Sequence, residues 1–378
     1  MKGVCVCWEV HLPYDIKWYW ANEGYQKPSM EKYFNLIKTF SNFDRFADEV
    51  ISSNEILKES IADGGKYSFN ISGTFIEQCK WNMEVISSFH GLLNSGNVEL
   101  LASPYYQSVC SLFENHSDFI EQVKKHSSTI NDIFDEKVQT LVNTQLLMSD
   151  EIARSAYQMG FRCMISEGSH NIVRKNDPVY VYKNHLPVIL RHINLSEDIE
   201  RRFSEKKWTG YPLIADKFAA WVNSMEGDVL TLYINYDSLS SHRKDSELIH
   251  DFIRDLPKSL ASHDIQMITP SEAVKLYSAR PLETLKREST ARYGINSLIG
   301  NHVQHIYMHE LTGAGKELEN IKDRSYHSSL QHIYRCLQQS SIMHDMNAVN
   351  YPLAYERAVN NLSILSDLKR ALISGDKQ

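Results

Sequence analysis

Short β-type runs alternate with helical stretches along roughly the first 285 residues of this 378-residue chain. Such alternation requires parallel strands joined by crossover helices, and about seven or eight such units favour a closed barrel over an open doubly wound sheet. Beyond that point the strand pattern stops and three helical stretches follow, the last with leucines at helical spacing from Leu362 to Leu372. We therefore predict an α/β chain with a (β/α) barrel domain over residues 1–284 and a C-terminal α-helical bundle over residues 285–378.

The predicted strands are short and rich in β-branched and aromatic residues. They are Gly3–His11, Lys66–Ile71, Val98–Ala102, Val138–Val142, Phe161–Ser166, Pro187–Arg191, Val229–Asn235 and Ile265–Ile268. The predicted helices are Glu31–Phe46, Thr74–Leu93, His116–Ile133, Asp150–Met159, Leu213–Val222, Ser246–Leu260, Asn296–Leu311, Ser325–Gln338 and Leu353–Ile373.

Charge and cysteine usage narrow the classes of function. The formal net charge is -7 without a long run of one sign, which argues against a nucleic-acid partner. No apolar run reaches membrane-spanning length, and Glu9 and His11 interrupt the N-terminal run, unlike in a signal peptide. The six cysteines lie mostly in apolar stretches, as buried thiols of a reducing compartment do. We expect a cytoplasmic protein with a weakly charged or uncharged ligand and no membrane partner.

Polar residues cluster directly after the predicted strands, where parallel barrels carry their active face. Glu9 and His11 follow the first strand and share one side of it by the two-residue period. Glu77, Gln145 and the segment Asn235–His242 follow later strands. We expect these side chains to surround a ligand. Because His11-Leu12-Pro13 stands where a dinucleotide fold has its glycine turn, we expect no cofactor.

Aromatic residues are abundant, with 20 Tyr, 14 Phe and 6 Trp. Exposed aromatic planes suit a carbohydrate, because pyranose rings present apolar C–H faces and aromatic side chains are large flat hydrophobes. Trp18 and Trp20 fall in a predicted loop, so we expect them to contact the ligand together with Trp208. Trp8 lies within a strand and is expected in the core.

Two segments near the N-terminus resemble motifs of glycoside hydrolase family 57, in its α-amylase-type members. Val10-His11-Leu12-Pro13 is similar to the family's His-Gln-Pro opening, and Gly73 followed four residues later by Glu77 resembles its second motif. The resemblance continues, in order and spacing, through Pro104–Ser108, Asn194–Phe203, Trp208–Phe218 and Leu337–Ser341. It implies a (β/α)7-type barrel with a helical C-terminal region and an α-glucan, such as a maltooligosaccharide, as ligand.

The same resemblance places amides at the two catalytic positions. Asn143-Thr144-Gln145-Leu146 resembles the family's Asn-Thr-Glu-Leu, which carries the nucleophile, and Asn235 stands where the Asp-Tyr-Glu-Thr-Phe-Gly-Glu-His segment has its general acid. Retaining glycosidases need carboxyl groups at both positions, and an amide neither ionises nor delivers a proton at neutral pH. We therefore predict a catalytically impaired protein whose two amides face one cleft and which binds α-glucan as an accessory or regulatory protein, beside an enzyme of polysaccharide metabolism. The expected ligand contacts are Glu9, His11, Trp18, Trp20, Glu77, Trp208 and His242.

Two other hypotheses remain open. The first is an active α-glucan hydrolase or transglycosylase that uses displaced carboxylates such as Glu9, Asp198 or Asp237. Asp237 lies two residues beyond Asn235 and can face the same way. Glu151 is a weaker candidate, because it suits the first turn of a helix. The second is an interaction protein that does not bind sugar.

A metal site is a weaker hypothesis. His302, His305 and His309 fall at i, i+3 and i+7 on a predicted helix, with Glu310 adjacent. This spacing matches no standard zinc pattern, so we expect a helix face against solvent or the barrel, with no metal.

Overall fold

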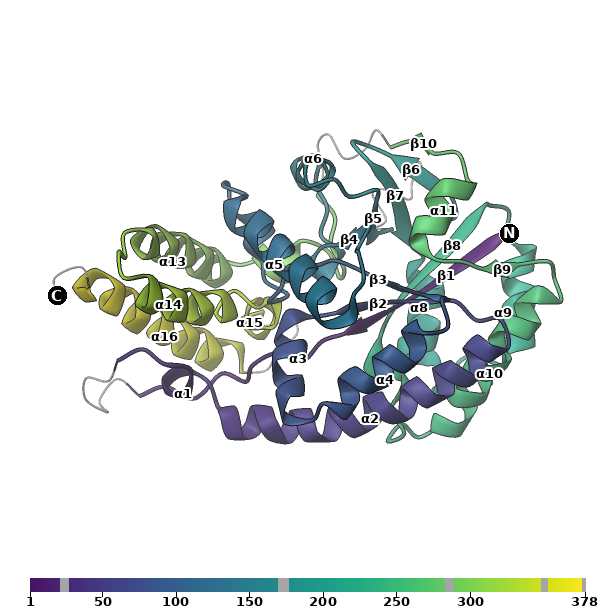
Figure 1. The fold of residues 1–378 in the computed structure, drawn as a ribbon, viewed down its shortest axis with the longest axis horizontal. Helices are drawn as coiled ribbons and strands as arrows, with labels where there is room; N and C mark the ends of the chain where they lie inside the picture. Colours follow the sequence, from purple (N-terminus) through teal and green to yellow (C-terminus); the bar gives the residue numbers. More distant parts are fainter. Residues whose placement is uncertain (21–26, 169–176, 283–288, 348–352, 376–378) are drawn as a thin grey trace.

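The computed structural model describes residues 1–20, 27–168, 177–282, 289–347 and 353–375. Within these parts, one sheet curves into a nearly closed barrel with helices around it, and the C-terminal helices pack beyond the C-terminal end of β1 (Figure 1). The seven parallel barrel strands of the described chain are β1 (Gly3–Val10), β2 (Tyr67–Ile71), β3 (Val98–Leu100), β4 (Thr140–Val142), β5 (Cys163–Glu167), β7 (Pro187–Arg191) and β8 (Val229–Asn235).

The strand pairing runs around a complete circuit. β1 pairs in parallel with β2 on one side and with β8 on the other, and β2 pairs with β3. A parallel bridge from Ala102 to Leu141 continues to β4, which pairs with β5, and β5 pairs with β7. β7 meets β8 at Arg191 and Thr231. This topology confirms the predicted (β/α)7-type barrel.

Every strand expected from the sequence is present, including β9 (Gln266–Met267), which pairs with the start of β1. The sequence pattern missed β6 (Val181–Lys183) and β10 (Arg280–Pro281), two short strands that extend the sheet beyond β7. Neither is long enough to show a two-residue alternation, so periodicity could not reveal them.

Helices join and surround the strands. They are α1 (Met30–Tyr33), α2 (Leu36–Ala62), α3 (Gly73–Gln78), α4 (Glu84–Leu93), α5 (Ser117–Phe134), α6 (Asp150–Gln158), α8 (Ile193–Glu197), α9 (Ala215–Ser224), α10 (Ser246–Ala261), α11 (Pro270–Leu276), α12 (Asn296–Ile299), α13 (His302–Glu319), α14 (Arg324–Cys336), α15 (Ser340–Asp345) and α16 (Ala354–Gly375).

Three helix predictions were wrong in extent. The predicted helix Asn296–Leu311 is divided into α12 and α13, and α13 continues to Glu319. The predicted helix ending at Phe46 in fact continues to Ala62 as α2, because the polar residues that interrupt its apolar pattern are buried with partners. Asn54, for example, accepts a hydrogen bond from Tyr236 Oη and donates one to Ser88 Oγ. The predicted helix Thr74–Leu93 is divided into α3 and α4 by a short 3-10 turn that ends before Asn82.

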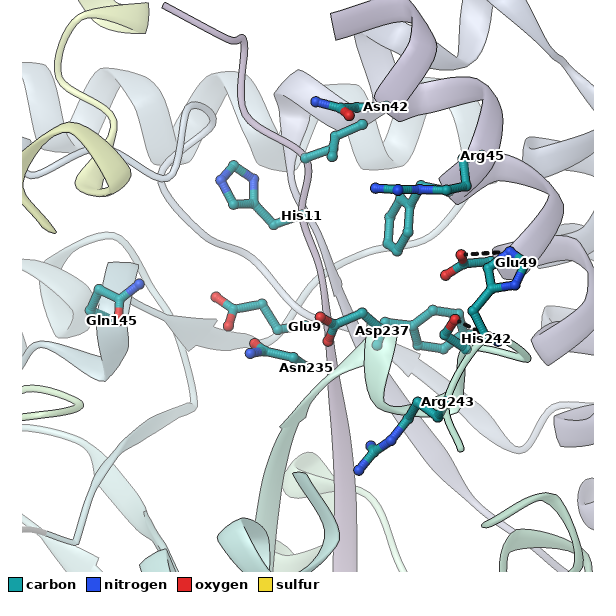
Figure 2. A pocket seen from close by; sticks show the side chains of 14 residues that line it. Glu9, His11, Asn42, Arg45, Glu49, Gln145, Asn235, Asp237, His242 and Arg243 are labelled. Carbon is teal, nitrogen blue, oxygen red and sulfur yellow. Dashed lines mark hydrogen bonds and ion pairs between the residues drawn. The ribbon is translucent and has the colours of Figure 1, made fainter. Parts of the chain in front are cut away.

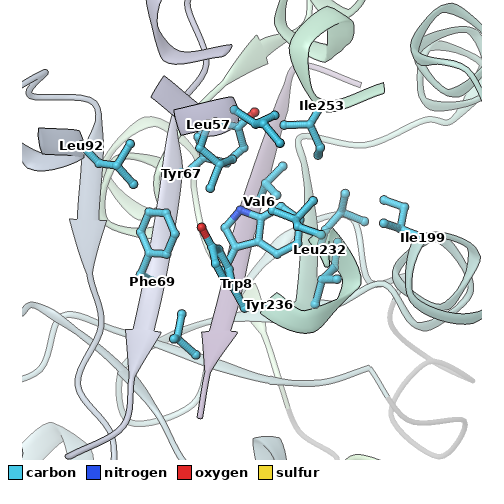
Figure 3. Close-up of a cluster of buried hydrophobic side chains, with 14 of the residues drawn as sticks. Val6, Trp8, Leu57, Tyr67, Phe69, Leu92, Ile199, Leu232, Tyr236 and Ile253 are labelled. Carbon is cyan, nitrogen blue, oxygen red and sulfur yellow. The ribbon is translucent and has the colours of Figure 1, made fainter. Parts of the chain in front are cut away.

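The residues of β1 alternate between two apolar layers. Val4, Val6 and Trp8 point outward into the core between the barrel and its helices, where Trp8 packs edge-on against Tyr236 (Figure 3). Cys5 and Cys7 belong to the other cluster, with Val142, Ile165 and Tyr233 of β4, β5 and β8. The odd-numbered side chains of β1 therefore fill the barrel interior, which directs Glu9 to the interior at its mouth.

The C-terminal helices share their apolar core with the start of the chain. Leu311, Leu330 and Leu368 of α13, α14 and α16 pack in one cluster with Tyr14 and Phe34. The predicted C-terminal helices are present, and residues 14–19 and 30–34 contribute to their packing.

The six cysteines are buried and carry free thiols, as the sequence predicted. None of the described helices has both the length and the apolar character needed to cross a lipid bilayer.

Candidate functional site

A cavity of about 940 Å³ opens at the C-terminal ends of β1 and β8 (Figure 2). Its wall comes from three regions: the strand ends and the loops that follow them, one face of α2, and the segment after β8. The lining residues are Glu9, His11, Leu12, Gln145 and Asn235; Asn42, Arg45, Phe46 and Glu49; and Tyr236, Asp237, Ser240, His242 and Arg243.

Glu9 and Asn235 are neighbours on adjacent parallel strands, paired in register at the top of β1 and β8. On each strand, alternate side chains point into the barrel, and Glu9 and Asn235 are the last residues of these interior-facing series. Their side chains therefore meet at the mouth of the barrel. The Glu9 side chain is 10% exposed and accepts a hydrogen bond from the guanidinium of Arg292, with Nη1 3.1 Å from Oε2. The same nitrogen donates to Asn235 Oδ1 at 3.1 Å.

Gln145 reaches the cavity from a tight turn after β4. Both Gln145 and Leu146 have φ near +54°, a left-handed conformation that costs non-glycine residues roughly 1–3 kcal/mol and often marks functional sites. Asn143 holds the turn, because its amide accepts from Thr144 N and donates to Leu147 O, each at 2.9 Å. The Gln145 side-chain oxygen is buried without a hydrogen-bond partner among the described residues.

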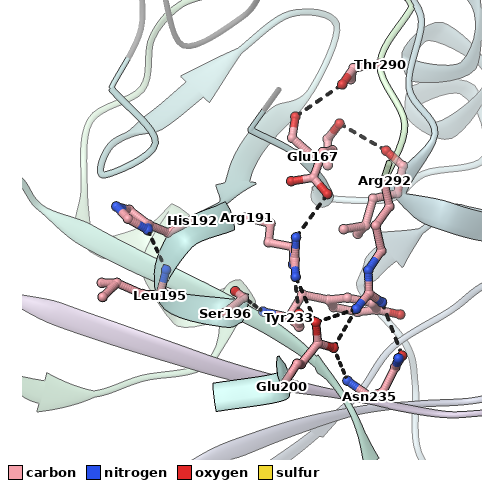
Figure 4. Close-up of polar contacts among 12 residues, drawn as sticks. Glu167, Arg191, His192, Leu195, Ser196, Glu200, Tyr233, Asn235, Thr290 and Arg292 are labelled. Carbon is pink, nitrogen blue, oxygen red and sulfur yellow. Dashed lines mark hydrogen bonds and ion pairs between the residues drawn. The ribbon is translucent and has the colours of Figure 1, made fainter. Parts of the chain in front are cut away.

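Arg292 sits at the centre of a buried charge network beneath the cavity (Figure 4). Its Nη2 donates to both oxygens of Glu200, at 2.5 and 2.6 Å. Glu200 also accepts from Arg191 Nη2 at 3.0 Å, and Arg191 Nη1 donates to Glu167 at 3.2 Å. Carboxylates and guanidinium groups thus alternate from β5 and β7 across to β1, and each of the five side chains is at most 10% exposed.

The protonation states follow from this environment. Burial raises the pKa of Glu9, although Arg292 acts in the opposite direction. The enclosing walls also raise the pKa of Asp237, with the nearby Glu200 charge adding to the effect. Burial lowers the pKa of His11 to about 4, so its ring is neutral at pH 7; its Nδ1 lies 2.9 Å from Ser72 Oγ.

The structure brings six of the residues singled out from the sequence to one cavity: Glu9, His11, Gln145, Asn235, Asp237 and His242. The others lie elsewhere. Glu77 accepts hydrogen bonds from Tyr14 and Tyr105, and Trp208 packs edge-on against Trp221. Trp18 and Trp20 are 46% and 63% exposed and contact one another beside α16, outside the lining of the cavity.

The alternative acids are placed less favourably. Asp198 does not line the cavity, and its carboxylate pairs with Arg202 at 2.5 Å. Glu151 lies in the first turn of α6, beside Asp150, as its position in the sequence suggested.

The histidines on α13 do not converge on a metal site. His302, His305 and His309 are exposed, and the described part of the chain contains no group of three or more ligands arranged to hold a metal ion.

Sequence reasoning did not single out the α2 residues of the wall, such as Arg45 and Phe46, or the ion-pair partners Glu200 and Arg292. Glu200 lies in a single π-helical turn, Asp198–Arg202, and Arg292 lies outside the helices and strands. One signal was available, since Arg191 ends an otherwise apolar strand and a buried arginine requires carboxylate partners.

Comparisons with known proteins agree with this architecture. The profile of "Glycosyl hydrolase family 57" matches residues 5–286. A relative named "Putative alpha-amylase" from Methanocaldococcus jannaschii is 30% identical over 389 aligned residues, which cover 96% of this chain and 83% of the relative.

Two solved structures share the fold at low sequence identity. A GH57 branching enzyme from Thermococcus kodakaraensis aligns with a TM-score of 0.70 and 12% identity over 98% of this chain and 90% of that one. An alpha-amylase from Thermotoga maritima aligns with a TM-score of 0.66 and 10% identity over 100% and 94%. Because the family profile spans the barrel strands and both amide-bearing segments, this chain belongs to glycoside hydrolase family 57.

Proposed function

We propose that this protein binds α-glucan without hydrolysing it by the two-carboxylate route, and serves in the cytoplasm as an accessory or regulatory protein beside an enzyme of polysaccharide metabolism. The observation that carries the proposal is that Gln145 and Asn235 line one cavity. By the motif resemblance, these residues stand where the family has its nucleophile and its general acid.

The chemistry of the amides supports loss of the usual reaction. A retaining glycosidase uses one carboxylate to attack the anomeric carbon and one protonated carboxyl group to release the leaving oxygen. Amides provide neither function, and general acid catalysis alone contributes typically ~10²–10⁴-fold in rate. Asn235 is further committed, because its side-chain oxygen accepts a hydrogen bond from Arg292.

An α-glucan ligand is supported by the relatives and by the lining of the cavity. The family's solved members include enzymes named for α-glucan chemistry, and the branching enzyme is described in complex with glucose. The cavity combines an aromatic ring, Phe46, with hydrogen-bonding groups such as His11 and Asp237. Ligand pockets that pair flat apolar surface with a few polar groups suit sugars.

The test is titration calorimetry with maltoheptaose beside a sensitive reducing-end assay on the same preparation. We expect binding without turnover, and we expect His11→Ala to weaken binding while His305→Ala, an exposed histidine on α13, leaves it unchanged. Absence of binding by a folded protein would reject the proposal in favour of an interaction protein whose cleft no longer takes sugar.

A second candidate function is hydrolysis or transglycosylation by displaced carboxyl groups. Glu9 and Asp237 both line the cavity and both have raised pKa values, which suits a general acid. Turnover that Asp237→Asn abolishes, and that Asp251→Asn on exposed α10 surface does not, would establish this function. Equal turnover in the two variants would exclude Asp237 as the acid.

A further inference from the structure

Arg292 lies across the barrel mouth between the two amide positions. Its backbone N donates to Gln145 O at 2.6 Å, while its Nη1 donates to Asn235 Oδ1 at 3.1 Å. One residue therefore spans from the loop after β4 to the end of β8. A retaining glycosidase keeps its two carboxyl groups only ~5–5.5 Å apart, with the sugar between them. In this chain the arginine links the two positions by hydrogen bonds, although it is not among the residues that line the cavity.

The arginine is held firmly in this position. Its side chain is 2% exposed, and Glu9 and Glu200 accept hydrogen bonds from its two terminal nitrogens. Moving it would leave these two carboxylates buried without their shared cation, a change that is strongly destabilising for buried ion pairs. A neutral sugar offers no charge to replace it. The inner half of the cavity, lined by Glu9, Gln145 and Asn235, is therefore held in a fixed arrangement.

The outer half of the cavity, by contrast, contains polar side chains that lack internal partners in the described part of the chain. Asn42, Arg45 and Phe46 lie on one face of α2, and Asp237 and His242 face them from the segment after β8 (Figure 2). Within the described residues, the Arg45 guanidinium and the Asp237 carboxylate form no hydrogen bond or ion pair with another side chain. These planar groups remain available to a ligand, whereas Glu9, Asn235 and Glu200 already accept hydrogen bonds from Arg292.

We infer that α-glucan binds in this outer half, along α2, with a sugar ring against Phe46 and its hydroxyl groups hydrogen-bonded to Arg45 and Asp237, and does not enter between Gln145 and Asn235. This inference rests on the proposed function, because it places the glucan that the function requires. Arg292 thereby acts as a positioning residue: it engages Glu9 and Asn235, so that these two side chains are committed to it and not to the ligand. Binding in this position keeps the glycosidic bond away from both former catalytic positions.

The experiment compares affinities for maltoheptaose across two sets of variants of the full chain. Arg45→Gln and Phe46→Ala should each weaken binding about tenfold or more, as ligand-contacting residues commonly do. Gln145→Ala and Asn235→Ala should change it by less than about twofold. Phe40→Ala and Lys58→Gln are matched controls on the same helix, outside the cavity, and should leave affinity unchanged.

Phe46 is partly buried and packs against Phe75, so the Phe46→Ala variant can lose structure. Arg45 is exposed, so Arg45→Gln still tests the inference if Phe46→Ala does not fold. Dependence on Gln145 or Asn235 with no effect of Arg45 would overturn the inference while leaving glucan binding intact. A wild-type protein that does not bind maltoheptaose would overturn the proposed function and this inference with it.

Discussion

At Asn235 a single neighbour, Arg292, determines how a carboxyl group introduced there would ionise. Arg292 Nη1 lies 3.1 Å from Asn235 Oδ1, so an aspartate there would accept an ion pair. An adjacent cation lowers the pKa of a carboxyl group, and an ionised group cannot act as the general acid. We predict that the double change Gln145→Glu with Asn235→Asp will not reach family-level activity, although it supplies the two carboxyl groups that the proposed function takes to be missing.

The measurement is the initial rate on maltoheptaose for the double variant, each single variant and the wild type. A rate within the ordinary range of enzymes, about 1–10³ s⁻¹, would show that the site is intact apart from two residues and would contradict the prediction. Adding Arg292→Met to the double variant provides the control. If the ion pair is the obstacle, the triple variant should be faster than the double variant provided that it folds.

Glu9 should couple stability to pH. Burial raises its pKa above the ordinary value of 4.5, so the folded protein holds this proton more tightly than the unfolded chain. The resulting contribution to stability is complete below that value and is lost as the pH rises through the raised folded-state pKa. Glu9→Gln does not titrate, so its stability relative to wild type should increase with pH above about 4.5 and then level off.

This difference is measured as the free energy of unfolding by urea at a series of pH values. Glu55→Gln, an exposed carboxyl group on α2, is the control and should show no such slope relative to wild type. A Glu9→Gln difference that falls with increasing pH would mean that Arg292, and not burial, dominates the environment of Glu9.

The residues of the cavity were predictable to the extent that they follow strands. Glu9, Gln145 and Asn235 were found because each lies at the end of a β-type run, a position that periodicity locates. Arg292 was not, since its partners Glu9 and Glu200 are distant in sequence and no local pattern records a long-range ion pair. The two amides could be named from the motif resemblance, but the arginine that hydrogen-bonds both residues required coordinates.

At the scale of elements, strands were predicted better than helices. A strand buried on both faces reads as a continuous apolar run, as β1 and β8 do. α2 is harder, because Ser53 and Asn54 break its apolar face, and only the structure shows that Leu239 O and Tyr236 Oη satisfy them. The sequence pattern therefore located the first part of α2 but neither its start at Leu36 nor its end at Ala62.

One residue of α16 fixes the N-terminal segment that carries Trp18 and Trp20. Asn360 is buried; its Oδ1 accepts from Tyr19 N at 2.8 Å, and its Nδ2 donates to Lys17 O at 3.1 Å. The Asn360 side-chain amide thus supplies the two hydrogen bonds that a neighbouring strand would make with this backbone. We predict that Asn360→Ala will accelerate amide hydrogen exchange at Tyr19, because a backbone donor loses a hydrogen bond worth about 0.5–1.5 kcal/mol.

Hydrogen exchange with mass spectrometry over residues 15–20 measures this effect. Ser363→Ala is the control on the same helix, because the Ser363 hydroxyl bonds only within α16, to Val359 O. Equal exchange in Asn360→Ala and wild type would show that packing of Tyr19 against Tyr33 holds the segment without the amide.

At the scale of the whole molecule, the barrel and the C-terminal helices are joined by buried amides. Gln339 accepts from Tyr14 N at 2.9 Å, and Gln338 accepts from Gln122 Nε2 at 3.0 Å. The backbones also meet, since Ser340 N donates to Gln107 O at 3.0 Å. The two parts that the sequence pattern separates, residues 1–284 and 285–378, therefore share one interface. Arg292, which contacts the strand ends at the barrel mouth, belongs to this interface.

This interface leads to a prediction about the division at residue 284. A chain of residues 1–284 lacks Arg292 and leaves Glu200 and Glu9 without their shared cation, and it uncovers the apolar side chains of Tyr14, Phe34 and Tyr106 that pack against the bundle. We predict that this fragment will not form a native barrel. It should show far-UV circular dichroism of a compact state, weak near-UV signal and binding of a hydrophobic dye, as partly packed states do.

Co-expression with residues 285–378 should restore the near-UV signal, because the missing contacts are all non-covalent. A fragment that unfolds cooperatively with full near-UV signal on its own would show that the barrel is an independent domain and that Arg292 is dispensable for its packing.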